Sequence, residues 1–490
     1  MSGSAQFDVP EPIVMHCQKN HLIQNLIMRW RYSLGAAVYH ANFYQPESSD
    51  ALTTLGQFGY LDAYRDGLRE ILTMSKGADF YLNWERGEKL SHGAHYYWLT
   101  RDPAFVHANT DEYVSMCDAL VQQIESDPNH LLHKQRQCGD IADVGYFTWH
   151  QTVCWRGLRD MAEVWRAVGR DDLAQRFRPV ADRFRDALRR AVEQSESRLP
   201  DGSLFIPRRL LEPTPEVFDP VTDTKLGSYW NLCMPYAFAS GFWDENGAAM
   251  DNIVRYMHGH GSTLLGLLRF NYYPTPVGDV TQDGLPGYMT TGFDNVYLPA
   301  YVQLLAERDD AERLILTFYS KLANGQTRNT FVSGEGDTAG PVPGMAYRSS
   351  YGSPCSANNA VFLQALRLML VRESFDHDTG APVSLFLAHA TPRQWLESGK
   401  RIVVRNAPTC YGPVSYTLES DLANRQVRGE VRLPNRNPAE SIAIKLRAPR
   451  PYRLRAVTIG DDTSARFDAT SETIVLTGQT GTVAIRAEYE

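Results

Sequence analysis

The sequence lacks the features that would place the protein in a membrane, on nucleic acid or in a disulfide-bonded fold. Its 490 residues contain no run of about 18 apolar residues, so no membrane-spanning helix is expected. Positive charge is scarce: 49 Lys and Arg stand against 57 Asp and Glu, and this acidic balance argues against nucleic acid or an anionic membrane as a partner. The seven cysteines are scattered without a C-x-x-C pair, which favours reduced thiols over a disulfide framework or a zinc site.

Targeting and cofactor motifs are also missing. The N-terminal stretch MSGSAQFDVPEP has no basic segment followed by an apolar one, so we expect no signal peptide and a cytoplasmic location. The segment GHGSTLLG lacks the lysine of a phosphate-binding loop, and SGEG lacks the G-x-S-x-G pattern of a serine hydrolase. His258 and His260 have no third ligand near them in the sequence, so we expect neither a metal nor a cofactor.

Helical patterns fill residues 17 to 372, where apolar residues recur at i, i+3 and i+4. They predict twelve helices, at residues 17–37, 48–59, 60–76, 90–102, 110–125, 148–169, 171–194, 228–242, 246–257, 293–309, 310–323 and 356–373. Short and long connections alternate between them. Because alternate connections of an up-down array lie at the same end, we expect the long ones to share one face and to carry the function. They are residues 40–50, 78–90, 131–147, 197–227, 259–291 and 325–355.

Beyond residue 380 the pattern changes to alternating apolar and polar residues with turn residues between them. This pattern predicts eight strands of an antiparallel β-sandwich. The strands are expected at residues 382–390, 401–408, 414–420, 426–434, 441–449, 452–460, 472–478 and 482–490. The fold class is therefore mainly α, with a helical domain at residues 1–378 and a β-sandwich at residues 379–490.

This order of elements resembles the six-hairpin glycosidase superfamily, the (α/α)6-barrel glycoside hydrolases. Three segments support the resemblance: WRYSLGAAVYHANFYQPESSDAL, CGDIADVGYFTWH and FVSGEGDTAGP. Glucoamylases, rhamnosidases and maltose phosphorylase-like enzymes belong to this group. The resemblance covers nearly the whole chain and implies hydrolysis of a glycosidic bond in an oligo- or polysaccharide. Many members carry a large β-sandwich before the barrel, and this sequence does not.

The resemblance also implies where the catalytic carboxyl groups lie. Glycoside hydrolysis needs one carboxylic acid to protonate the leaving oxygen and a second carboxylate to activate water or attack the sugar. In inverting members these come from the loops before the sixth and the twelfth helix. The candidates for the acid are Asp140 and Asp143, with Asp140 the first choice; the candidate base is Glu335, with Asp337 the runner-up. Each has a structural alternative: Asp143 as a helix cap and Glu335 as an ordinary turn residue.

The other long loops supply residues suited to binding sugar, because sugar sites pair aromatic faces with carboxylates and arginine. We predict a carbohydrate as the partner and the following substrate-binding residues, with Asp337 included: Trp84, Glu85, His95, Tyr146, Trp149, Trp230, Arg269, Asp283 and Asp294.

Two other functions fit the same elements. A polysaccharide lyase would take a proton with Tyr146 or His150 and use Arg136 to neutralise a uronate, and a phosphorylase would need a basic phosphate pocket. A non-catalytic carbohydrate-binding protein would keep the barrel without its acids; carboxylates in both expected loops argue against it.

Overall fold

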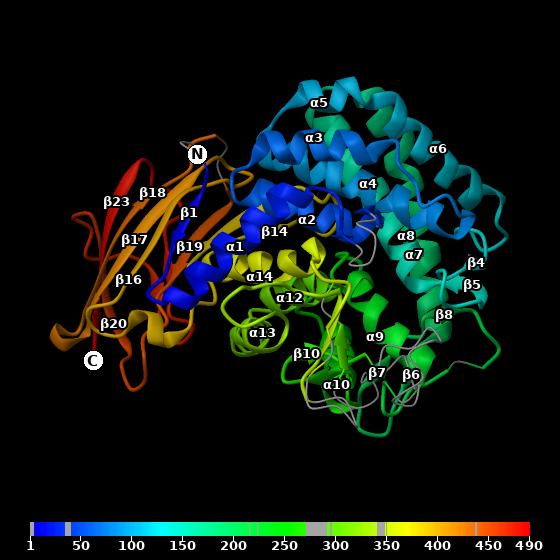
Figure 1. The fold of residues 1–490 in the computed structure, drawn as a ribbon. Coiled ribbons are helices and arrows are strands. Elements are labelled where there is room, and N and C mark those ends of the chain that lie inside the picture. The colour runs from blue at the N-terminus through cyan, green and yellow to red at the C-terminus, as the bar shows by residue number, and fades with distance from the viewer. Residues whose placement is uncertain are drawn as a thin grey trace.

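The protein consists of a helical part and a part made of two β-sheets, which lie side by side (Figure 1). The structure is a computed structural model, and it describes residues 4–34, 41–214, 216–222, 224–270, 292–294, 296–340, 348, 350–436 and 439–490. Both chain termini lie at the sheets. Within the described ranges, no helix is long and apolar enough to cross a membrane.

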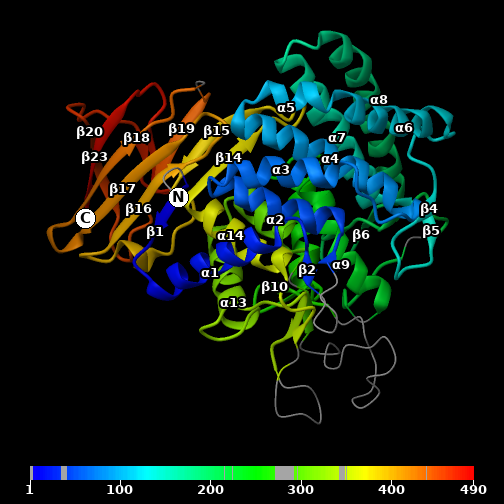
Figure 2. The same ribbon diagram turned by 45° about the horizontal axis from the view of Figure 1, so that its top comes forward.

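Six helices of the described chain contact one another in a closed ring: α2 (Gln45–Gln57), α4 (Asp79–Thr100), α7 (Thr148–Ala167), α9 (Lys225–Phe238), α12 (Leu298–Glu307) and α14 (Ser356–Leu370). The remaining helices are α1 (Pro12–Met28), α3 (Leu61–Leu72), α5 (Pro103–Ala108), α6 (Thr110–Ser126), α8 (Asp171–Ser195), α10 (Ala248–Gly259) and α13 (Ala311–Asn324). Several of these pack against members of the ring, as α8 does on α7 and α13 on α12 and α14. The second view shows the ring helices from another side (Figure 2).

The prediction of a long loop at residues 78–90 is wrong, because these residues form the first half of α4. Gly87 lies in this half of α4, where its role is close helix packing. A Cβ at Gly87 would lie 2.9 Å from the backbone of Cys154, and one at Gly157 would lie 2.5 Å from the carbonyl oxygen of Gly87. The two glycines therefore let α4 and α7 approach backbone to backbone.

Other helix boundaries also differ from the prediction. The first helix begins at Pro12 and ends at Met28. Proline suits the first position of a helix, because the N–H that it lacks would have no partner within the helix there. The short helix α5 was not predicted; Asp102 caps it by accepting hydrogen bonds from Ala104 N and Phe105 N. The connection between α3 and α4 is short, so the strict alternation of long and short loops does not hold there.

The eight predicted strands of the C-terminal part are all present, in two sheets. The strands are β15 (Pro382–Leu387), β16 (Arg401–Ala407), β17 (Val414–Asp421), β18 (Gln426–Arg432), β19 (Ser441–Lys445), β20 (Leu454–Ile459), β22 (Thr473–Val475) and β23 (Thr482–Tyr489). The strand order of one sheet is β1-β16-β17-β18-β23-β20, and that of the other is β14-β15-β19-β22-β21. β15 and β19 pair in parallel, so the sheets are not purely antiparallel as expected.

Three strands of these sheets were not predicted: β1 (Gln6–Asp8), β14 (Val371–Phe375) and β21 (Phe467–Asp468). β1 pairs with β16, with Phe7 opposite Val404, so the N-terminus belongs to the C-terminal sheet. β14 continues directly from α14 and pairs with β15. The hairpin formed by β14 and β15 spans the domain boundary expected at residue 378.

Candidate active site

Carboxyl groups from three segments of the chain lie close enough to Tyr44, the residue before α2, for their charges to affect its pKa. Burial raises the pKa of Tyr44 above its usual value, and the charges of Tyr81, Glu47, Glu335 and Asp140 raise it further. Burial likewise raises the pKa of Tyr32, with further contributions that include Glu335 and Glu47. Glu335 and Glu47 therefore lie near both tyrosines, and Asp140 lies near Tyr44.

Aromatic rings form a continuous wall beside these carboxylates. The ring centroids of Tyr32 and Tyr44 are 5.2 Å apart, and those of Tyr44 and Tyr81 are 6.0 Å apart. Tyr81 contacts Trp84 at 5.4 Å, and Trp84 contacts Trp149 at 4.4 Å. Trp84 and Trp149 are each 2% exposed and Tyr81 is 7% exposed, so these rings pack in the core, and Tyr44 is a partly exposed ring of the row.

Glu47 lies in the first turn of α2; the sequence favours a helix start at this position, with contact to sugar hydroxyls as the second interpretation. The helix begins at Gln45 with Pro46 second, which places Glu47 near the positive end of the helix dipole. The side chain is buried, and Tyr297 donates its hydroxyl hydrogen to Glu47 Oε1 over 2.7 Å. A buried carboxylate held in this way is a strong candidate for contact with substrate.

Glu335 lies in the loop just before β12 (Gly336–Thr338) and is half-buried. A Cβ at Gly352 would lie 3.2 Å from the Cβ of Glu335 and 3.4 Å from its Oε2, and Gly352 has a φ of 67°. Only glycine suits that backbone conformation and leaves the carboxylate its space. Burial is the main cause of the raised pKa of the Cys355 thiol, and the charge of Glu335 raises it further.

Asp140 is exposed in a loop whose backbone is fixed by neighbouring side chains. Arg136 donates hydrogen bonds to the carbonyl oxygens of Gly139 and Ile141, over 2.6 and 3.0 Å. Gly139 N donates to the Tyr81 hydroxyl over 3.1 Å. Arg136 therefore shapes the loop that presents Asp140 beside the aromatic wall.

Asp143 has a different environment from Asp140. It forms an ion pair with Arg208, which is 3% exposed and also donates to Gln137 Oε1 over 3.0 Å. Burial alone would raise the pKa of Asp143, but Arg208 and Arg209 outweigh it and lower the pKa. Asp143 does not cap α7, whose N-cap is Phe147. A carboxyl with a lowered pKa is a poor proton donor.

Several predicted sugar-binding residues make contacts that support the fold. Glu85 accepts a hydrogen bond from Lys76 N over 2.8 Å. Tyr146 donates to Asp127 Oδ2 over 2.8 Å, and Trp230 donates to the carbonyl oxygen of Ile206 over 2.6 Å. His95 is buried among the ring helices, where burial lowers its pKa to about 3.

The remaining predicted residues lie around the loop between α10 and α12. Asp337 is buried on β12, opposite Phe293 of β11 (Gly292–Asp294). The backbone of Asp294 pairs with that of Gly336, next to Glu335. The backbone of Arg269 forms an isolated β-bridge with that of Phe293. Asp283 lies outside the described residues.

A cavity of about 140 Å³ lies within the helical ring, lined among others by Asp50, His92 and Tyr236. Asp50 is one helical turn beyond Glu47, and Tyr236 donates to its Oδ2 over 2.6 Å. Burial raises the pKa of Asp50 to about 7. Neither Asp140 nor Glu335 lines this cavity. We therefore treat the carboxylates near Tyr44, and not this cavity, as the candidate active site.

The raised pKa of Asp50 predicts how the stability of the fold changes with pH. Its pKa is about 7 in the folded chain but about 3.9 when unfolded, so between these values only the unfolded chain loses the proton. The contribution of Asp50 to stability is therefore present below about pH 4 and lost as pH rises to about 7. Asp50→Asn should remove this loss, which is at most about 4 kcal/mol. Thermal unfolding at pH 4.5 and pH 8 should show the variant gaining on the wild type at the higher pH; a constant difference would contradict this assignment.

Comparisons with known proteins identify the fold. No family model and no curated protein sequence matches the chain. Among solved structures, an α-L-rhamnosidase from Dictyoglumus thermophilum has a TM-score of 0.55 at 10% identity, over 99% of this chain and 50% of that one. The Streptomyces avermitilis α-L-rhamnosidase complexed with L-rhamnose has a TM-score of 0.54 at 12% identity, over 99% and 42%. A GH78 family rhamnosidase of Bacillus sp. GL1 has a TM-score of 0.52 at 13% identity, over 85% and 40%.

The chain spans half or less of the length of these structures. It shares the fold of these three rhamnosidase structures.

Proposed function

We propose that the chain is a glycoside hydrolase built on an (α/α)6 barrel with a C-terminal β-sandwich. The closed ring of contacts from α2 through α14 and back to α2 supports the barrel, with the other helices packed outside. The two sheets in the C-terminal part support the sandwich. The convergence of Glu47, Asp140 and Glu335 on Tyr44, at one end of this ring, is the observation that carries the function.

In the proposed reaction Asp140 is the general acid and Glu335 the general base. Asp140 is exposed beside the aromatic wall, so it can reach the oxygen of a leaving group. Glu335 comes from a different loop, and a water activated by it would attack the anomeric carbon from the opposite side. The proton of this water passes to Glu335 as the proton of Asp140 passes to the leaving oxygen. This mechanism inverts the configuration at the anomeric carbon.

Glu47 has a supporting role in this proposal. Its buried carboxylate is fixed by Tyr297 and lies close enough to Tyr32 and Tyr44 to raise their pKa. We propose that it accepts hydrogen bonds from sugar hydroxyls, which orients the ring between the acid and the base. Such positioning contributes to catalysis by holding the reacting atoms in line.

The first substrate to test is an α-L-rhamnoside, on the strength of the three rhamnosidase structures. A lyase is less well supported, because its proton acceptors would be Tyr146 and His150. Tyr146 is engaged with Asp127, and His150 is buried with a hydrogen bond between its Nδ1 and Gln135.

A panel of p-nitrophenyl glycosides would test the proposed function. We expect release of p-nitrophenol from the α-L-rhamnoside, and proton NMR of the first product should show the inverted anomer. Activity on another glycoside alone would keep the hydrolase and change the sugar. Absence of hydrolysis across the panel and across rhamnose-containing oligosaccharides, with a double-bond absorbance from a uronate polymer, would favour the lyase instead.

A further inference from the structure

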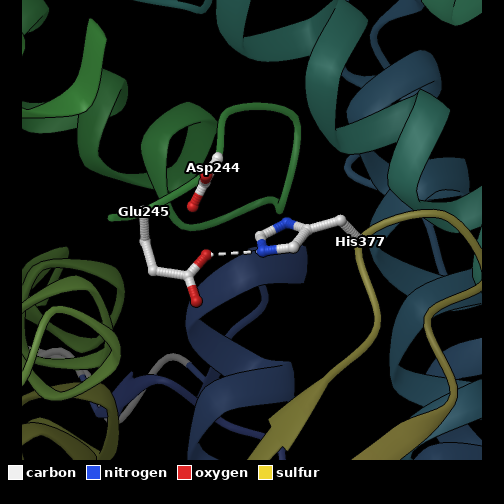
Figure 3. Close-up of side chains that lie close together, drawn as sticks. All are labelled: Asp244, Glu245 and His377. Carbon is white, nitrogen blue, oxygen red and sulfur yellow. Dashed lines mark ion pairs between the residues drawn. The ribbon is translucent and has the colours of Figure 1, made fainter. Parts of the chain in front are cut away.

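A second cluster of potential ligands lies away from the proposed active site, where the helical part meets the sheets. Asp244 and Glu245 belong to the loop between α9 and α10, and His377 belongs to the turn between β14 and β15 (Figure 3). One ligand atom of each residue lies within 4.8 Å of the others. Figure 3 shows both carboxylates directed toward the same side of the imidazole.

The imidazole of His377 is oriented as a metal ligand would be. Its Nδ1 lies 3.2 Å from the carbonyl oxygen of Gly241, and a carbonyl can only accept, so Nδ1 carries a hydrogen. Nε2 then faces the carboxylates and lies 2.7 Å from Glu245 Oε2. A histidine that binds a metal through one nitrogen commonly donates from the other to a backbone carbonyl.

The segments that carry the three side chains are fixed in place. Arg159 donates to the carbonyl oxygen of His377 over 2.9 Å, and Arg308 donates to the carbonyl oxygen of Glu245. Asn246 N donates to Asp244 Oδ1 over 3.0 Å. The Glu245 carboxylate accepts hydrogen bonds from His377 and from its own backbone N–H, and no hydrogen bond to Asp244 Oδ2 is found among the described residues. Fixed ligands with open lone pairs lower the cost of binding a metal.

We propose that Asp244, Glu245 and His377 bind a zinc ion, which joins the loop between α9 and α10 to the turn between β14 and β15. Imidazole and carboxylate ligands suit Zn²⁺, and a water completes the tetrahedron. Zinc bonds of about 2.0 Å set ligand atoms roughly 3.3 Å apart, so Glu245 moves away from Nε2 by about 0.6 Å. The ion takes the place of the hydrogen between them, and that proton leaves to solvent.

This site could not be predicted from the sequence, because its residues come from segments far apart in the chain. The expectation of no metal rested on local motifs such as HGHG. His260 of that motif lies between two carboxylates, but each of its nitrogens faces one of them: Nε2 is 3.1 Å from Asp201 and Nδ1 is 3.1 Å from Asp219. Among the described residues, no backbone carbonyl accepts a hydrogen bond from this ring, so the arrangement found at His377 is not repeated here. His260→Gln is therefore a matched control.

The experiment is a titration of the chelator-treated full chain with zinc chloride, followed by calorimetry and thermal unfolding. We expect one zinc per chain and a rise of a few degrees in the unfolding midpoint. Asp244→Asn keeps the contact between His377 and Glu245, so it should fold normally and bind zinc at least tenfold more weakly. His377→Gln should abolish the site, and His260→Gln should bind like the wild type.

A cobalt titration gives an independent readout, because tetrahedral Co²⁺ with such ligands has strong visible absorption bands. All seven cysteines are buried, so exposed thiols do not compete for the metal. The proposal is overturned if no stoichiometric zinc binds, if His260→Gln rather than Asp244→Asn weakens binding, or if Ca²⁺ raises the midpoint as much as Zn²⁺ does.

Discussion

Glu335→Gln and Asp140→Asn should each lower turnover of an unactivated rhamnoside by ~10²–10⁴, because each removes a proton-transferring group. The two variants should differ on a glycosyl fluoride, since fluoride leaves without protonation. Asp140→Asn should recover much of its activity on this substrate, and Glu335→Gln should not. Circular dichroism and the unfolding midpoint should stay near those of the wild type, because Asp140 is exposed and Glu335 lies in a loop.

Asp143→Asn is the matched control for the acid, because it lies in the same loop but is paired with Arg208. It should change turnover only a few-fold and should show no selective rescue by fluoride. The assignment is wrong if Asp143→Asn loses more activity than Asp140→Asn. A loss in Glu47→Gln that equals that of Glu335→Gln, at saturating substrate, would make Glu47 the base.

Gly157→Ala should destabilise the fold strongly, although helix propensity alone predicts the opposite. Alanine in place of a helical glycine normally adds up to about 1 kcal/mol of stability. Here the added Cβ would lie 2.5 Å from the carbonyl oxygen of Gly87, so α4 and α7 must move apart. Overpacking against backbone costs about 3 kcal/mol, which outweighs the gain. The unfolding midpoint should fall by several degrees.

Gly259→Ala provides the control, because Gly259 is the last residue of α10 and a Cβ there would meet nothing within 4 Å. It should leave the midpoint unchanged or raise it slightly. Near-ultraviolet circular dichroism should report the movement in Gly157→Ala, since Trp84 of α4 and Trp149 of α7 are 4.4 Å apart. Equal midpoints for the two variants would show that the helices do not depend on the glycine contact.

The strands were predicted more accurately than the helices for a physical reason. β17 and β23 each have one buried face, so the alternation of apolar and polar residues marks them directly, as in the burial patterns BiBiBeBi and eBeBeBiB. α4 lies in the ring and is buried on most of its circumference, polar residues Asn83 and Glu88 included. Its sequence therefore lacks the one-sided pattern that marks a surface helix.

The candidate site was predicted in part. The two loops that carry Asp140 and Glu335 were named from the sequence resemblance; both charges act on Tyr44, and the catalytic roles stay predictions. Glu47, Tyr32 and Tyr44 were not named as site residues, because a carboxylate at a helix start and a tyrosine before it are common for structural reasons. Trp230 and Tyr146 were named on residue type alone, which cannot separate an aromatic ring that faces substrate from one that fills the core.

The pairing of β1 with β16 has a consequence for the order in which the protein assembles. Residues 6–8 are synthesised before every ring helix, but their partners at residues 403–405 are made only after the last of these helices. The first strand must therefore wait, with its hydrogen-bonding groups in water, until the last quarter of the chain has been synthesised. Closing so long a loop is slow in relation to local helix formation. The helical part can gather early, but the sheet that receives β1 is completed only at the end of synthesis.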